Sequence, residues 1–67
     1  HGHLLTGESA HAGKSIRDSG IREETLGLVV GLEREGKRFV NPDSRMVLAP
    51  GDFLWIAGDK DRLKKLV

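Results

Sequence analysis

The stretch GKSIRDSGIREETLGLVVGLER, from Gly13 to Arg34, decides the fold that the sequence predicts. Its first part has the form of a helix capping box, because Ser15 is followed three residues later by Asp18. Gly20 supplies the left-handed backbone position at which helices commonly end. We therefore expect a short first helix between Ser15 and Gly20, stable only if it packs on a sheet.

The second part of the stretch is predicted to be a polar connection followed by a buried strand. Residues 26–32, LGLVVGL, combine β-branched side chains with the length of a strand. Gly27 and Gly31 are unusual inside a strand and indicate bulges or the close approach of two backbones. The connection from Gly20 to Arg22 is the first place to look for a binding site.

The rest of the chain is predicted to complete the sheet. Leu4 and Leu5 can open an edge strand, and residues 33–37 are expected to form a hairpin turn that leads into a strand at 38–40. Residues 53–57, FLWIA, are apolar on both faces and so are expected to form a central strand. These elements predict an α+β fold: a mostly antiparallel four-stranded sheet with a short first helix and a C-terminal helix packed on it, in the order β-α-β-β-β-α.

The C-terminal helix is predicted from its cap and from its two faces. Asp59 or Asp61 can cap the first turn. The apolar side chains would face the sheet, and the basic side chains would face water. The apolar residues are Leu63, Leu66 and Val67, and the basic residues are Lys60, Arg62, Lys64 and Lys65.

The length and composition indicate one small domain that gains from a partner. A chain of 67 residues is too short for two domains, so we expect a single domain over residues 1–67. Residues 1–3 are expected to be disordered, or to be additions to the natural chain. The core of so short a chain is marginal, and the hydrophobic content is only 37%. A homodimer, or a place within a longer chain, is therefore expected.

The charge balance and the missing cysteines narrow the classes of function. Eleven Lys and Arg residues against ten Asp and Glu residues give a net charge of +1, without the basic stripe of a non-specific DNA binder. A small nucleic-acid-binding domain that uses the basic residues of the last helix is a rival interpretation. No cysteine and no long apolar run are present, so we expect a soluble, cytosolic fragment without a disulfide framework or zinc ribbon.

No catalytic or metal site is predicted. His1, His3 and His11 lie in the part of the sequence with the least predicted order, so we interpret them as solvated rather than as metal ligands. No serine has a histidine placed near it, and the acids fall at turns and caps, where they have structural roles. We therefore predict that the domain is not an enzyme and needs no cofactor.

Arg22 is the residue with the clearest choice of roles. It can form a surface ion pair with Glu23, Glu24 or Asp18, which contributes about 0–1 kcal/mol. It can instead bind an anion, because a guanidinium group grips a phosphate through two parallel hydrogen bonds. The residues alone favour the ion pair.

Three short motifs, taken in order, resemble a known family. They are GKSI at residues 13–16, NPD at 41–43 and PGD at 50–52, and the likeness extends over about residues 4–67. This combination resembles the TrkA-C domain, also called the RCK C-terminal domain. The version with SGIRE, GLVVGLER and LWIAGDK is most similar to the C-terminal domain of bacterial cation/proton antiporters.

The resemblance implies a regulatory, non-catalytic and dimerising module on the cytoplasmic side of the membrane. It would belong to a potassium or sodium/proton antiporter, or to a related cation transport system. Several members of the family bind cyclic di-adenosine monophosphate (cyclic di-AMP) between two subunits. A dimerisation and coupling module without a small ligand is the alternative.

The resemblance also implies the residues of a ligand site. The family's contacts match Ile21, Arg22 and Pro42 of this sequence. Asn41 precedes that proline in the NPD turn and is included in the predicted site. Leu28 stands where some members have a polar residue, often Asn, that hydrogen-bonds the ligand.

Overall fold

The computed structural model describes residues 1–64 and consists of one four-stranded sheet with two short helices. All strand pairs are antiparallel, and the strand order across the sheet is β1-β4-β2-β3. The predicted α+β class and the predicted order of elements are confirmed. Within residues 1–64, no helix is long and apolar enough to cross a membrane. The elements are β1 (Gly2–Leu4), α1 (Ile21–Thr25), β2 (Leu28–Arg34), β3 (Lys37–Val40), β4 (Phe53–Ala57) and α2 (Lys60–Leu63).

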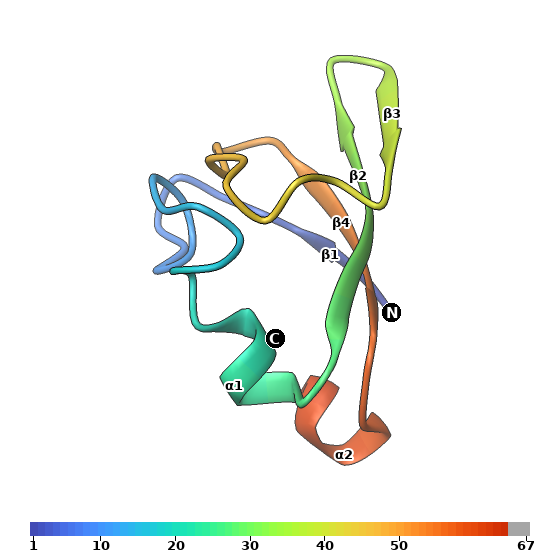
Figure 1. Ribbon diagram of the computed structural model, residues 1–67. Coiled ribbons are helices and arrows are strands. Elements are labelled where there is room, and N and C mark those ends of the chain that lie inside the picture. Colours follow the sequence, from blue (N-terminus) through green and yellow to red (C-terminus); the bar gives the residue numbers. More distant parts are fainter. Residues whose placement is uncertain (65–67) are drawn as a thin grey trace.

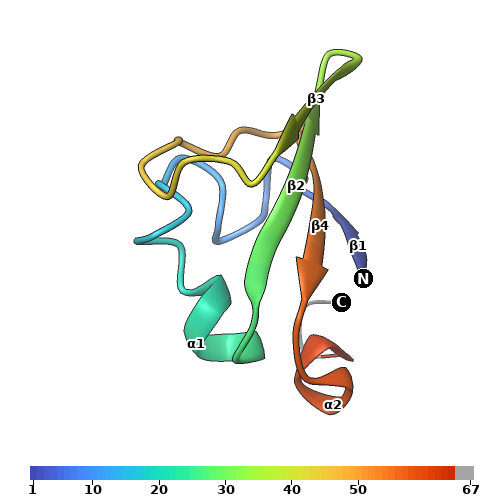
Figure 2. The same ribbon diagram turned by 45° about the vertical axis from the view of Figure 1, so that its right-hand side comes forward.

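The hydrophobic core lies on one face of the sheet. Figures 1 and 2 show α1 and the two long loops on that face, with α2 beyond the end of β4. β4 lies between β1 and β2, as its apolar composition predicts, and Leu54 and Ile56 point into the core. The remaining core side chains come from elements far apart in sequence, and they are Leu5, Ile21, Leu32 and Leu48.

The first helix begins where the sequence pattern predicts the end of a helix. Gly20 has the expected left-handed conformation, with φ 85°, but it precedes α1 instead of terminating a helix. The Oγ of Ser19 accepts a hydrogen bond from the main-chain N of Ile21. Ile21 and Thr25 are four residues apart and both are buried, so one side of α1 faces the core. The predicted connection from Gly20 to Arg22 is therefore the start of this helix.

Residues 14–17 are not helical, because their main-chain groups bond to another segment. Ser15 forms an isolated antiparallel bridge with Val47. The main-chain N of Ile16 donates to the O of Met46 at 2.9 Å, and that of Arg17 donates to the O of Ser44 at 2.8 Å. A helix there would give up these bonds. The Ser15 Oγ still accepts from the N of Asp18, so the local capping contact forms around a turn.

The two glycines of β2 behave as predicted, although the strand itself is shifted. β2 begins at Leu28 because Leu26 ends α1 in a left-handed conformation, with φ 53°. A Cβ on Gly27 would lie 2.1 Å from the main-chain O of Ala57, so the two backbones touch here. The pairing of β2 with β4 has a register shift between Val29 and Gly31. Close approach and a bulge are both present.

The β2–β3 hairpin is tighter than predicted. Arg34 pairs with Lys37, which leaves Glu35 and Gly36 as the two turn residues. Their φ angles are 50° and 79°, the positive values of a type I′ turn, whose twist suits an antiparallel hairpin. The predicted turn at 33–37 is therefore too long, because Glu33, Arg34 and Lys37 belong to the paired strands.

The two ends of the described chain correct one prediction and sharpen another. The first residues are ordered: Gly2 to Leu4 pair with β4, and the O of His1 accepts from the N of Ile56 at 2.8 Å. At the other end, the cap of α2 is Asp59, whose side chain accepts from the main-chain N of Asp61 and of Arg62. Leu63 packs against the core, as expected. Lys65, Leu66 and Val67 lie outside the described residues.

Candidate functional site

A hollow of about 370 Å³ opens between α1, the start of β2 and the two long loops. This volume is within the range of small-molecule sites in proteins. Its floor and one wall are aliphatic, and charged groups lie at its rim. We call it the α1 pocket. It is lined by Ile16, Arg17, Ile21, Arg22, Glu23, Gly27, Leu28, Val29 and Ser44.

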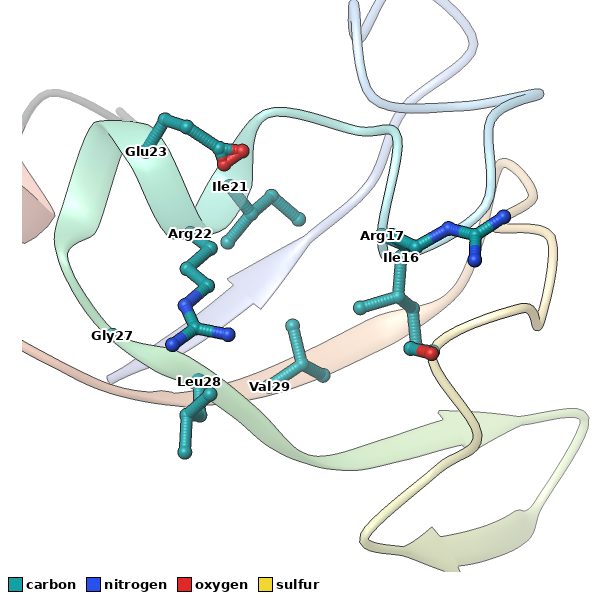
Figure 3. A pocket seen from close by; sticks show the side chains of 9 residues that line it. Ile16, Arg17, Ile21, Arg22, Glu23, Gly27, Leu28 and Val29 are labelled. Carbon is teal, nitrogen blue, oxygen red and sulfur yellow. The ribbon is translucent and has the colours of Figure 1, made fainter.

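Three segments place the walls of the α1 pocket. α1 contributes Ile21 and Arg22, and β2 contributes Leu28 and Val29. The opposite wall is the pair of loop segments joined by the Ser15–Val47 bridge, which brings Ile16 and Ser44 to the rim. Figure 3 shows Ile16, Ile21 and Val29 pointing toward one another, with Arg22 reaching from α1 toward Leu28.

The sequence-predicted residues come together only in part. Ile21, Arg22 and Leu28 all line the α1 pocket. Asn41 and Pro42 are not among its lining residues, although Ser44, in the turn that follows them, is. The main-chain N of Asn41 donates to the O of Val30 at 2.9 Å, which fastens the NPD turn beside β2.

Ile21 has a different position from the one expected. The sequence pattern predicts a polar connection at this position, but the side chain of Ile21 is 1% exposed and belongs to the core. It also lines the α1 pocket, and because it is almost fully buried it can only form the floor. Any ligand contact by Ile21 in a single copy of the domain is limited to that floor.

The ion pair expected for Arg22 is absent among residues 1–64. Two of the three acids expected to pair with it have other partners. The carboxylate of Glu24 lies 3.3 Å from the Nε2 of His11, and that of Asp18 lies 3.8 Å from the Nε of Arg17. In the described part of the chain, the exposed guanidinium of Arg22 has no carboxylate partner within 4.0 Å. A cation beside an aliphatic hollow suits a ligand with an anionic group and an apolar or aromatic body.

The edge of β2 next to the α1 pocket is uncovered. β3 pairs with β2 only from Gly31 to Arg34, so within the described residues no strand covers the β3 side of Leu28 and Val29. Main-chain groups along such an edge are available to hydrogen-bond a ligand or another chain. The arginine, the aliphatic walls and this edge lie around one opening.

Six residues that line the α1 pocket were not predicted as site residues, and they are Ile16, Arg17, Glu23, Gly27, Val29 and Ser44. Ile16 and Ser44 reach the α1 pocket only through the pairing of two distant loops, for which the sequence has no periodic signal. Glu23 follows directly from the start of α1, so a correct helix boundary would have placed it.

The three histidines are more ordered than expected. His11 is buried, and the rings of His3 and His11 have centroids 6.3 Å apart. The prediction of a solvated terminus is therefore wrong for His11, whose loop folds against α1, and for His3, which is half-buried on β1, whereas His1 is exposed. Among residues 1–64, no group of histidine, cysteine or acidic side chains is arranged to hold a metal ion.

One ion pair fastens the NPD turn. The Nη2 of Arg45 lies 3.0 Å from the Oδ2 of Asp43. This hydrogen-bonded arginine and the main-chain N of Arg45 lower the pKa of Asp43 to about 2. Asp43 is therefore an anion throughout the neutral range and is committed to the turn.

Fold and pocket together define a small α+β domain with an exposed arginine beside an apolar hollow. The sequence profile of the TrkA-C domain matches residues 4–67, and the chain belongs to this family. Domains of the family are regulatory and are not enzymes.

The sequence relatives are cation transport proteins. Probable potassium channel protein 2 of Methanocaldococcus jannaschii is 36% identical over 63 residues, which cover 94% of this chain. The chain spans only 18% of the length of that channel protein. The match therefore concerns one domain of a longer protein.

Two solved structures have the same fold with a ligand bound. The RCK_C domain dimer of S. agalactiae BusR, in complex with cyclic di-AMP, has a TM-score of 0.83 and 31% identity; the match covers 96% of this chain and 84% of that one. The RCK C domain of the potassium transport protein KtrA, also in complex with cyclic di-AMP, has a TM-score of 0.83 and 25% identity, with coverages of 97% and 74%. None of the matches described here, a potassium channel protein, BusR and the potassium transport protein KtrA, is named as an antiporter.

Proposed function

We propose that this chain is a cyclic di-AMP-binding regulatory domain of a bacterial cation transport protein, and that two copies share one dinucleotide. The parent protein we propose is a cation/proton antiporter, with this domain on the cytoplasmic side of the membrane. The observation that carries the proposal is Arg22, which has no carboxylate partner in the described residues and stands at the rim of an apolar pocket.

The chemistry of the α1 pocket suits a nucleotide. Ile21, Val29 and Leu28 offer an aliphatic surface for a purine ring, and the uncovered edge of β2 offers main-chain groups for its hydrogen-bonding edge. The guanidinium of Arg22 can grip a phosphate with two parallel hydrogen bonds. The cyclic di-AMP complexes of the BusR and KtrA domains support the choice of this dinucleotide.

The symmetry of the ligand calls for two copies of the domain. A cyclic dinucleotide has two equivalent phosphates and two bases, whereas one copy presents one Arg22. A two-fold axis through the ligand would place one Arg22 at each phosphate. Asn41 and Pro42, which lie outside the α1 pocket of one copy, would then be candidates to contact the ligand from the second copy.

Calorimetry with cyclic di-AMP tests the proposal. Each charge-assisted hydrogen bond contributes about 1.5–3 kcal/mol, so losing both arginines through Arg22→Ala should weaken binding roughly 100-fold or more. Arg38→Ala is the matched control, because Arg38 is an exposed arginine paired with Glu33 on the β2–β3 hairpin, outside the α1 pocket. It should bind like the original chain.

Two results would contradict the proposal. One is the absence of heat from the original domain at high concentrations of cyclic di-AMP. The other is equal binding by the Arg22→Ala and Arg38→Ala variants. Cyclic di-GMP serves as the specificity control, because it keeps both phosphates and changes only the bases.

A further inference from the structure

His11 links the loop that follows β1 to α1. Its ring is buried, with 8% of the residue exposed. The Nε2 lies 3.3 Å from the Oε2 and 3.4 Å from the Oε1 of Glu24, which is on α1. On the other side of the ring, the Nδ1 lies 3.3 Å from the Oγ of Ser9. That hydroxyl also accepts from the main-chain N of His11, so the position of the ring is fixed from both sides.

A second histidine lies against His11 from the sheet. His3 is on β1, opposite Leu54, and its ring meets that of His11 edge-on, with a centroid distance of 6.3 Å. Burial lowers the pKa of His3, the proximity of His11 lowers it further, and Glu24 partly offsets these effects. Two protonated rings so close would repel each other. Two titratable groups thus face His11 from the elements around it: His3 from β1 and Glu24 from α1.

Protonation changes the character of the contact between His11 and Glu24. A neutral His11 with its proton on Nε2 donates to the carboxylate, while its Nδ1 accepts from the hydroxyl of Ser9. When both nitrogens carry protons, the same contact becomes an ion pair. Charge-assisted N–H···O bonds are about 2.7–2.9 Å long, so the contact of 3.3 Å has room to shorten by about 0.5 Å.

The element that this contact holds is short. α1 contains five residues, and a helix of this length has no stability of its own in water. Its position depends on the buried side chains of Ile21 and Thr25 and on the contact of Glu24 with His11. Arg22 lies two residues before Glu24 on the same helix, so a shift of α1 moves the arginine of the α1 pocket.

We propose that the contact between His11 and Glu24 is a proton-sensitive clasp, in which protonation of His11 tightens the attachment of Glu24 and so fixes α1 and the position of Arg22. The clasp makes the position of Arg22 at the α1 pocket depend on pH. The clasp itself depends only on contacts within the domain. Its effect on ligand affinity rests on the function proposed above.

Amide hydrogen exchange measured by NMR tests the clasp without any ligand. After correction for the intrinsic effect of pH, the amides of Glu24 and Thr25 should exchange about 3- to 10-fold more slowly at pH 6 than at pH 8. His11→Gln keeps a neutral donor, and Glu24→Gln removes the charge of the acceptor; both should abolish this difference. Glu8→Gln makes the same charge change at an exposed position of the same loop and should retain it.

The side chain of Glu24 is 46% exposed, so the Glu24→Gln variant keeps the test decisive even where His11→Gln does not fold. Equal exchange at pH 6 and pH 8 in the original domain would overturn the proposal. A pH effect that persists in Glu24→Gln would overturn it as well.

Calorimetry with cyclic di-AMP at the same two pH values tests the coupling to the pocket. When α1 is already fixed, less conformational entropy is lost as Arg22 binds the ligand. Binding should therefore be at least about threefold tighter at pH 6 than at pH 8 in the original domain, and equal at both pH values in Glu24→Gln. If the domain binds no dinucleotide at either pH, the proposed function fails, and the exchange experiment still decides on the clasp. Binding without a pH effect in the original domain would overturn the coupling.

Discussion

The carboxylate of Asp52 shows how a single residue holds this small fold together. It is 1% exposed and accepts two hydrogen bonds from Arg34, at 2.8 Å from Nε and 2.6 Å from Nη2. It also accepts from the main-chain N of Ala49 at 2.8 Å. The end of β2, the PGD turn and the start of β4 meet at this group. The hydrogen-bonded arginine holds the pKa of Asp52 below its usual range.

Asp52→Asn should lower the free energy of unfolding by roughly 2–3 kcal/mol at pH 7. Removing one partner of a buried ion pair costs about 3–5 kcal/mol, and the one-third exposure of the Arg34 side chain reduces that cost. Urea denaturation monitored through Trp55 fluorescence measures the change. Equal stability of the two proteins at pH 7 would show that the pair is not a stabilising contact.

The pH dependence of the same variant follows from the sign of the pKa shift. Because the pKa of Asp52 is lower in the folded state, its contribution is fully present above the unfolded value of about 4 and is lost as the pH falls through the folded value. The original domain should therefore lose stability below about pH 4 more steeply than Asp52→Asn. Parallel stability curves for the two proteins would contradict this assignment.

At the residue scale, the sequence could predict which side chains carry charge but not which charges meet. Arg22 has acids on both sides in sequence, so a surface ion pair was the expected outcome. The fold instead directs the carboxylate of Glu24 to His11 and places Arg17 beside Asp18. These choices depend on how a loop folds onto α1, which is a long-range event.

At the scale of elements, strands with strong local patterns were predictable and the short helix was not. β4 spans the predicted residues, because FLWIA is apolar on both faces and is bounded by turn residues. The helix expected at Ser15 to Gly20 is absent because residues 14–17 bond to residues 44–48, a contact that no local pattern reveals. The same pairing builds one wall of the α1 pocket, so Ile16 and Ser44 could not be predicted as lining residues from local sequence patterns.

Gly27→Ala tests the close approach of the two chain segments beside α1. A Cβ at this position would lie 2.1 Å from the main-chain O of Ala57, so α1 and β2 would have to move away from the end of β4. We expect a loss of about 2–4 kcal/mol, or roughly 10–25 °C in the midpoint of thermal unfolding for a domain of this size. Differential scanning calorimetry measures the shift.

Gly7→Ala is the matched control, because a Cβ there would have no heavy atom within 4 Å and the backbone is not left-handed. It should leave the midpoint within a few degrees of the original. A Gly27→Ala domain as stable as the Gly7→Ala domain would rule out the tight packing described here.

At the scale of the whole molecule, the domain leaves much apolar surface uncovered. Leu28, at the rim of the α1 pocket, is 56% exposed, and Trp55, on the sheet face opposite the core, is 42% exposed. Apolar surface of this kind marks contact sites with other proteins or domains. It agrees with the small core expected for a chain of this length, and with a relative in which the matching segment is 18% of the protein.

Sedimentation of the domain with cyclic di-AMP, followed at 260 nm in the analytical ultracentrifuge, tests whether two copies of the domain share one dinucleotide. We expect the dinucleotide to move with a species of two chains, at one ligand per two chains, and to stay free in the presence of the Arg22→Ala variant. If the dinucleotide also stays free with the original domain, at protein concentrations far above those used for Arg22→Ala, the proposed binding is contradicted. A complex of one ligand with one chain would contradict the shared site.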